Sequence, residues 1–213
     1  MKRLAATVIA AMLGASPVHA AADCAADADR LRAHLEQADT ATFRWNTTWT
    51  VLFGAAAVGQ VVLAVTEYKP FGTFDEATRD TYYVGAGKAT LAFATRVFTP
   101  LRVSVPAPNE DRCTELVALR ASLKAVANKE RQGFWLGHTG GLLLNVAASA
   151  YLWNRHSLTD GAIAFAMSYP VGLAHTYTMP RKSWHLYRAE QASWSVSLSV
   201  HPERTMFSIA GEM

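Results

Sequence analysis

Residues 45–66 contain no charged side chain, and this feature constrains the fold of the chain more than any other. A helix of this length covers a hydrocarbon core of about 30 Å at about 1.5 Å per residue. Trp45 and Trp49 lie at its start, and tryptophan rings favour the level of the lipid headgroups. The stretch therefore predicts a helix that spans a membrane.

Three further apolar stretches follow, at residues 82–103, 133–153 and 161–178. The short polar segment 154–160 predicts that the last two form an antiparallel pair. Only 17% of all residues are charged, against about a quarter in soluble domains. We therefore expect an all-α membrane protein in which residues 45–178 form a four-span helical bundle, interrupted by an extramembrane amphipathic helix at about residues 110–131.

Residues 1–20 have the pattern of an export signal. Lys2 and Arg3 precede a short apolar run, and the small-residue cleavage pattern follows at residues 18–20. The run is too short to cross a bilayer. We expect cleavage after Ala20 and a location in the bacterial inner membrane as a multi-pass protein, with the N-terminal helix, residues 21–44, and the tail, residues 179–213, in the periplasm.

The distribution of positive charge conflicts with this orientation. Cytoplasmic loops of membrane proteins are enriched in lysine and arginine. The segment 104–132, which the export signal places outside, contains Arg112, Arg120, Lys124, Lys129 and Arg131. We favour the export signal because its three-part pattern is the more specific one, and the inverted topology stays open as the alternative.

Cys24 and Cys113 are the two cysteines of the chain and lie on one side of the membrane in either orientation. Each belongs to the apolar face of an expected amphipathic helix, where leucines recur at helical spacing. In an oxidising compartment such a pair predicts a disulfide bond. Two unrelated buried thiols are the alternative.

Polar side chains inside the apolar stretches are the candidates for a functional site, because charged groups at membrane depth are costly. Arg96, His138 and His175 each lie a few residues from the outer end of their stretch. We expect all three in one polar pocket near the outer membrane surface. The other such residues are Gln60, Lys88 and Asn145.

Three interpretations of this pocket stay open. The side chains could reach the interface and form hydrogen bonds between helices. The pocket could bind a small molecule or a lipid headgroup, with Arg96 as the contact for an anion. His138 and His175 could ligate haem or a metal, as paired histidines do in membrane cytochromes, although the sequence offers no second pair.

The C-terminal segment has a different periodicity. Residues 194–201 alternate between apolar side chains and serine or histidine, which predicts a strand, and residues 205–209 predict the returning strand of a β-hairpin. A lone hairpin is marginally stable in water, so we expect it to pack on the extramembrane helices.

No nucleotide-binding, metalloprotease or hydrolase motif is present, so we assign no catalytic residue. The net charge of +3 comes without a basic run, which argues against nucleic-acid binding. We expect an integral cell-envelope protein with a structural or interaction role, whose partners are the lipid bilayer and another envelope protein or a second copy, without a cofactor. The alternatives are a haem- or metal-binding electron-transfer protein and, third, a small-molecule or ion transporter.

Overall fold

The computed structural model describes residues 17–70, 72–191, 195–201 and 204–210, with side chains for residues 23–70 and 72–191. Five helices and two strands lie in the described residues. They are α2 (Pro17–Val65), α3 (Glu76–Phe98), α4 (Arg112–Arg155), α5 (Leu158–Tyr177), α6 (Lys182–Gln191), β1 (Ser195–His201) and β2 (Arg204–Ala210).

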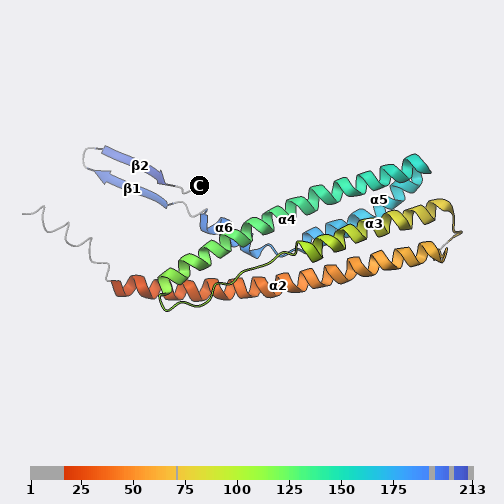
Figure 1. The fold of residues 1–213 in the computed structure, drawn as a ribbon. Coiled ribbons are helices and arrows are strands. Elements are labelled where there is room, and N and C mark those ends of the chain that lie inside the picture. Colours follow the sequence, from red (N-terminus) through yellow and green to blue (C-terminus); the bar gives the residue numbers. More distant parts are fainter. Residues whose placement is uncertain (1–16, 71, 192–194, 202–203, 211–213) are drawn as a thin grey trace, which may run out of the picture.

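The long helices α2 and α4 run in the same direction and define the length of the molecule (Figure 1). α3 packs along the second half of α2, and α5 packs along the second half of α4. The first half of α4 packs instead against α2 and α6. The elongated body therefore has two ends, which we call the disulfide end, at residues 24–43 and 110–131, and the apolar end, where α3 and α5 lie.

Polar side chains fix where three helices begin. The carboxylate of Asp75 accepts a hydrogen bond from the amide of Thr78 at 2.7 Å, and Asp111 accepts one from the amide of Cys113 at 3.1 Å. Ser157 caps α5 in the same way. Each cap satisfies an amide that the first turn of a helix leaves without a partner.

The disulfide end has a leucine core between α2 and α4. Leu35, Leu119 and Leu123 are completely buried there. Ala28, Leu31, Leu116 and Val126 complete the cluster, and Cys24 packs against it. These residues recur every three or four positions on their helices, which places them on one face. The two amphipathic faces therefore pack on each other.

The predicted four-span bundle is wrong. Among the described residues only α2, over Asp23–Val65, is long and apolar enough to cross a membrane. Lys88 and Arg96 interrupt the apolar stretch of α3, and histidine, asparagine, glycine and hydroxyl side chains lower the hydropathy of α4 and α5. The amphipathic segments 21–44 and 110–131 are also not separate short helices, because α2 and α4 each continue from them into the next apolar stretch.

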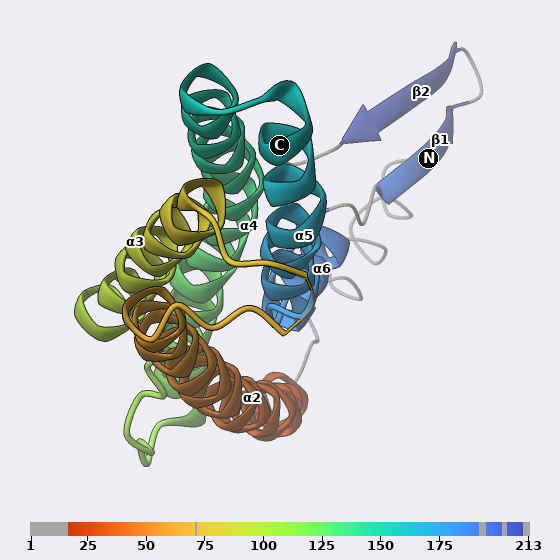
Figure 2. The same cartoon turned by 90° about the vertical axis from the view of Figure 1, so that its right-hand side faces the viewer.

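The fold class is corrected to an all-helical body, since residues 17–70 and 72–191 contain no strand. β1 and β2 follow that body and pair only with each other, antiparallel, with Val196 opposite Ile209 (Figure 2). The sequence predicts that the C-terminal β-hairpin packs on the helices. That packing depends on side chains outside those that the structure describes. The predicted signal peptide lies outside the described residues up to residue 16, and α2 begins at Pro17.

Candidate functional site

A second core, built mainly from aromatic rings, begins where the leucine core ends. Its buried members are Trp45, Trp49, Leu101, Phe134 and Met179, and Phe53 and Trp184 pack against it. We call this cluster the aromatic junction, because it lies between the disulfide end and the apolar end. Residues 45, 49 and 53 are one helical turn apart, so their three rings share one face of α2.

His175 of α5 lies among the rings of the aromatic junction. Its imidazole stacks on Trp45 with 4.8 Å between ring centres and meets the edge of Trp49 at 5.0 Å and Phe53 at 5.3 Å. The guanidinium carbon of Arg96 lies 4.9 Å from the ring centre of the same Trp45. The structure therefore brings two of the three predicted pocket residues together on one tryptophan.

His138 has a different set of neighbours. Its ring stacks on Phe134 at 5.2 Å between centres and meets Tyr177 at 5.3 Å, and its Nε2 lies 3.4 Å from the hydroxyl of Tyr177. The structure records no ring contact between His138 and His175 in the described residues. The expected pocket of three residues is thus divided, and His138 reaches the aromatic junction through Phe134.

This arrangement does not favour ligation of haem by the two histidines, which requires both imidazoles to face one iron atom. His138 and His175 instead pack on different sets of rings. The described residues also contain no group of three or more histidine, cysteine, aspartate or glutamate side chains that could hold a metal ion.

Buried polar atoms without a hydrogen-bond partner among the described residues gather at the aromatic junction. Such atoms are rare in folded proteins, and each requires an explanation. Three of them lie in the cluster around Trp45, namely Trp45 Nε1, Arg96 Nε and His175 Nε2. The others are Thr42 Oγ1, Asn46 Oδ1, Glu130 Oε1, His138 Nδ1 and, further along α4, Ser149 Oγ.

A second polar cluster lies within the apolar end, where Lys88 of α3 meets α4 and α5. Its Nζ donates hydrogen bonds to Asn145 Oδ1 at 3.1 Å and to Ser168 Oγ at 2.8 Å. The hydroxyl of Ser168 donates to the same Asn145 oxygen at 2.6 Å. Sequence reasoning identified Lys88 and Asn145 but missed Ser168, because a serine in an apolar helix is too common to indicate a site.

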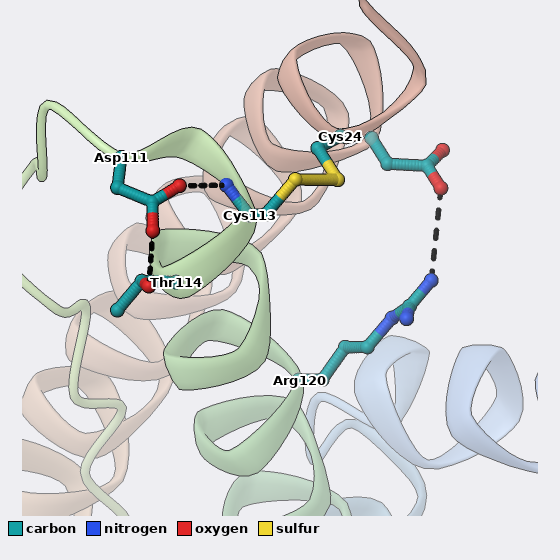
Figure 3. Close-up of a disulfide and its surroundings, with 6 residues drawn as sticks. Cys24, Asp111, Cys113, Thr114 and Arg120 are labelled. Atoms are coloured by element: carbon teal, nitrogen blue, oxygen red, sulfur yellow. Dashed lines mark hydrogen bonds and ion pairs between the residues drawn. A yellow bond between two sulfur atoms is a disulfide. The ribbon is translucent and has the colours of Figure 1, made fainter. Parts of the chain in front are cut away.

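The disulfide end contains the predicted cysteine pair. Cys24 and Cys113 are joined, with their Cα atoms 5.1 Å apart (Figure 3). This separation lies within the range that a disulfide bond requires. The predicted pairing is confirmed in its geometry. Arg120 of α4 forms an ion pair with Asp27 of α2 at 3.6 Å beside the bridge.

A buried carboxylate links the same two helices through charge. Glu115 of α4 is almost completely buried, and its Oε1 accepts a hydrogen bond from Nε of Arg32 at 2.9 Å. Arg112 contacts the other oxygen of Glu115 and also pairs with Asp29. The hydrogen bond from Arg32 is the main cause that holds the pKa of Glu115 below its usual range.

Acid is therefore expected to destabilise the disulfide end. A carboxyl group with a lowered folded-state pKa stabilises the fold above its unfolded pKa of about 4.3, and this contribution is lost as the pH falls through the folded pKa. Thermal unfolding between pH 7 and pH 3 measures the effect. Glu115→Gln should flatten the pH dependence, whereas Glu36→Gln, at an exposed position of α2, should not. An equal loss of stability in Glu115→Gln and the parent protein would contradict the assignment.

No family model matches the chain, and no curated protein and no solved structure is significantly similar to it. A function is therefore inferred from the residues of this chain alone.

Proposed function

We propose that the chain is a membrane-anchored protein of the bacterial cell envelope with a structural or interaction role. The apolar second half of α2 lies in the bilayer, and the disulfide end lies in the periplasm. The observation that carries this proposal is the exposed apolar surface of α2. Only 17% of the most apolar window of this helix is buried inside the protein.

From residue 51 onward, α2 exposes six large apolar side chains. They are Val51, Leu52, Val58, Val61, Val62 and Val65. Hydration of apolar surface costs about 25 cal/mol per Å², and soluble monomers rarely expose large contiguous apolar patches. A buried core helix would be covered by its neighbours, whereas most of the apolar window of α2 is not. Lipid chains are therefore the cover that we propose for this surface.

The neighbouring helices extend the same surface. α3, α4 and α5 expose further large apolar side chains, namely Leu91, Phe98, Leu136, Leu143, Ile163 and Met167. Charged side chains mark the far tip of the apolar end, where Arg155 Nε donates to Asp80 Oδ2 at 2.6 Å. Exposed apolar surface of this extent is more than soluble monomers usually show, and it ends at this ion pair.

The disulfide bond supports the periplasmic side for the opposite end. Disulfides persist in the bacterial periplasm and are rare in the cytosol, where thiols are kept reduced. Cys24 and Cys113 lie near the starts of α2 and α4, and Figure 1 shows that this end of the two helices is away from α3 and α5. The predicted export signal, residues 1–20, would deliver that end to the oxidising side.

Fractionation of cells that express the full chain tests the proposal. The protein should sediment with membranes, resist extraction by alkaline carbonate and begin at Ala21 by N-terminal sequencing. Val58→Arg should release a large share of it, because Val58 lies within one turn of the middle of residues 45–66, and arginine at the centre of a spanning helix costs about 2.5–3.5 kcal/mol. Ala33→Arg, at an exposed position in the first half of α2, is the matched control and should stay in the membrane.

Recovery of the parent protein in the soluble fraction would contradict membrane anchoring. An intact N-terminus at Met1 would contradict the cleaved signal and would favour the inverted topology.

A further inference from the structure

We propose that Arg96, Trp45 and His175 form a binding site for a phosphate group at the aromatic junction. The three side chains come from α3, α2 and α5, and both Arg96 and His175 contact the indole ring of Trp45. The site is separate from the lipid-facing surface of α2 and from the leucine core.

Arg96 has no counter-ion among the described residues. No carboxylate among the described residues forms an ion pair with it, and its buried Nε has no hydrogen-bond partner there. A guanidinium has five N–H donors and no acceptor, so only an acceptor satisfies it. A partly buried cation without an anion is costly. Arg96 is therefore held ready to bind an anion.

The groups next to Arg96 are hydrogen-bond donors as well. Trp45 is only 6% exposed, and its indole N–H, which can only donate, has no partner among the described residues. His175 Nε2 is likewise buried without a partner there, and it donates in the tautomer that carries its proton on this nitrogen. Three donors without partners among the described residues thus lie around one tryptophan ring, and an oxyanion is the kind of ligand that would satisfy them.

Among oxyanions, phosphate fits this set of donors best. The planar guanidinium binds two oxygens of a phosphate at once, and phosphate keeps further oxygens for the other two donors. The site also lies at the level where lipid phosphates are expected, because Trp45 precedes the exposed apolar residues Val51 and Leu52 of α2 by about two turns. Asn46, next to Trp45, donates a hydrogen bond to the carbonyl of Leu101 at 2.7 Å, which ties α2 to the segment that follows α3.

Phosphate can reach the site as the headgroup of a phospholipid or as the free ion. The lipid source rests on the proposed membrane anchoring, whereas binding of free phosphate does not.

Calorimetric titration of the full chain in a non-ionic detergent tests the site with two probes, inorganic phosphate and dihexanoyl-phosphatidylglycerol, with chloride at equal ionic strength as the blank. At least one probe should bind saturably. Arg96→Gln should weaken its affinity by roughly tenfold or more, because it removes a charge-assisted hydrogen-bond donor. Arg102→Gln makes the same charge change at an exposed position and should leave the affinity unchanged.

Trp45→Phe provides a second measurement if Arg96→Gln does not fold. It keeps an aromatic ring beneath Arg96 but removes the N–H donor, so it should weaken binding severalfold. Saturation by the lipid alone assigns the headgroup as the ligand, and saturation by both probes shows that the phosphate group suffices.

Absence of saturable binding by either probe would overturn the site, as would affinities that neither Arg96→Gln nor Trp45→Phe changes. A protein that resists carbonate extraction but binds neither probe overturns this site and leaves the anchoring intact. A protein that stays in the soluble fraction and binds phosphate contradicts the anchoring and leaves this site intact.

Discussion

Cys24→Ser is expected to destabilise the disulfide end by about 4–5 kcal/mol relative to the oxidised parent protein, since the bridge joins residues separated by 89 positions. A cross-link across so long a loop removes much of the conformational entropy of the unfolded chain. The leucine core between α2 and α4 is small, so it cannot easily offset the loss of this link. The apolar end should keep its structure, because its helices pack on each other independently of the bridge.

Hydrogen exchange of the amides of residues 28–38 and 116–126 measures the free energy of opening at the disulfide end. Reduction of the parent protein is the matched control and should lower the free energy of opening by the same amount. A reductant should not change the free energy of opening of Cys24→Ser. The parent protein should also migrate faster on non-reducing gels. Two cysteines that react freely with a maleimide in unreduced protein would contradict the bridge.

The disulfide end could be predicted closely from the sequence because its signals are local. Leu31 and Leu35 on one segment, and Leu116, Leu119 and Leu123 on the other, recur at the spacing of a helix face. Two cysteines on two such faces leave one pairing. The two faces then pack on each other, because exposing the leucines of either face to water is unfavourable.

The helix boundaries could not be predicted in the same way. The composition changes from amphipathic to apolar near residue 44, and such a change predicts the end of a helix. The backbone contains no glycine or proline from residue 18 to residue 53, so nothing in the chain stops α2 there. In α4 the change falls at Gly133, which the helix tolerates at a cost of about 1 kcal/mol. A change from amphipathic to apolar composition does not by itself end a helix.

The candidate site was predicted in part. The rise per residue gives the depth of Arg96, His138 and His175 along their helices, and this depth places all three near the aromatic junction. Depth does not give the direction in which a side chain points, which depends on how the helices pack. That is why His138 lies against Phe134 and Tyr177 rather than beside His175.

Trp45 was recognised from the sequence only as an anchor at the level of the headgroups. Its role as a shared platform for Arg96 and His175 depends on contacts between three helices. The repeat of aromatic rings at residues 45, 49 and 53 was the available signal. On its own, such a repeat indicates a buried face and not which polar groups will meet it.

Leu119→Ala is expected to lower the free energy of unfolding of the disulfide end by about 3–5 kcal/mol. Leu119 is 0% exposed and lies in the leucine core with Leu35 and Leu123. Truncating a buried leucine removes its transfer free energy and leaves a cavity that the surrounding structure fills only partly. Long, continuous helices such as α2 and α4 cannot easily move together to close it, because the disulfide bond at one end and the aromatic junction at the other fix their separation.

Val117→Ala is the matched control, because Val117 lies two residues away on the same helix but is 68% exposed. Its replacement should change stability by no more than about 0.5 kcal/mol. Both variants are compared with the parent protein under oxidising conditions by hydrogen exchange at residues 28–38, so that the bridge stays intact in all three. Similar losses in the two variants would show that the face of α4 assigned to the core is wrong. A large loss in Leu119→Ala alone is the result that the packing of the two helices requires.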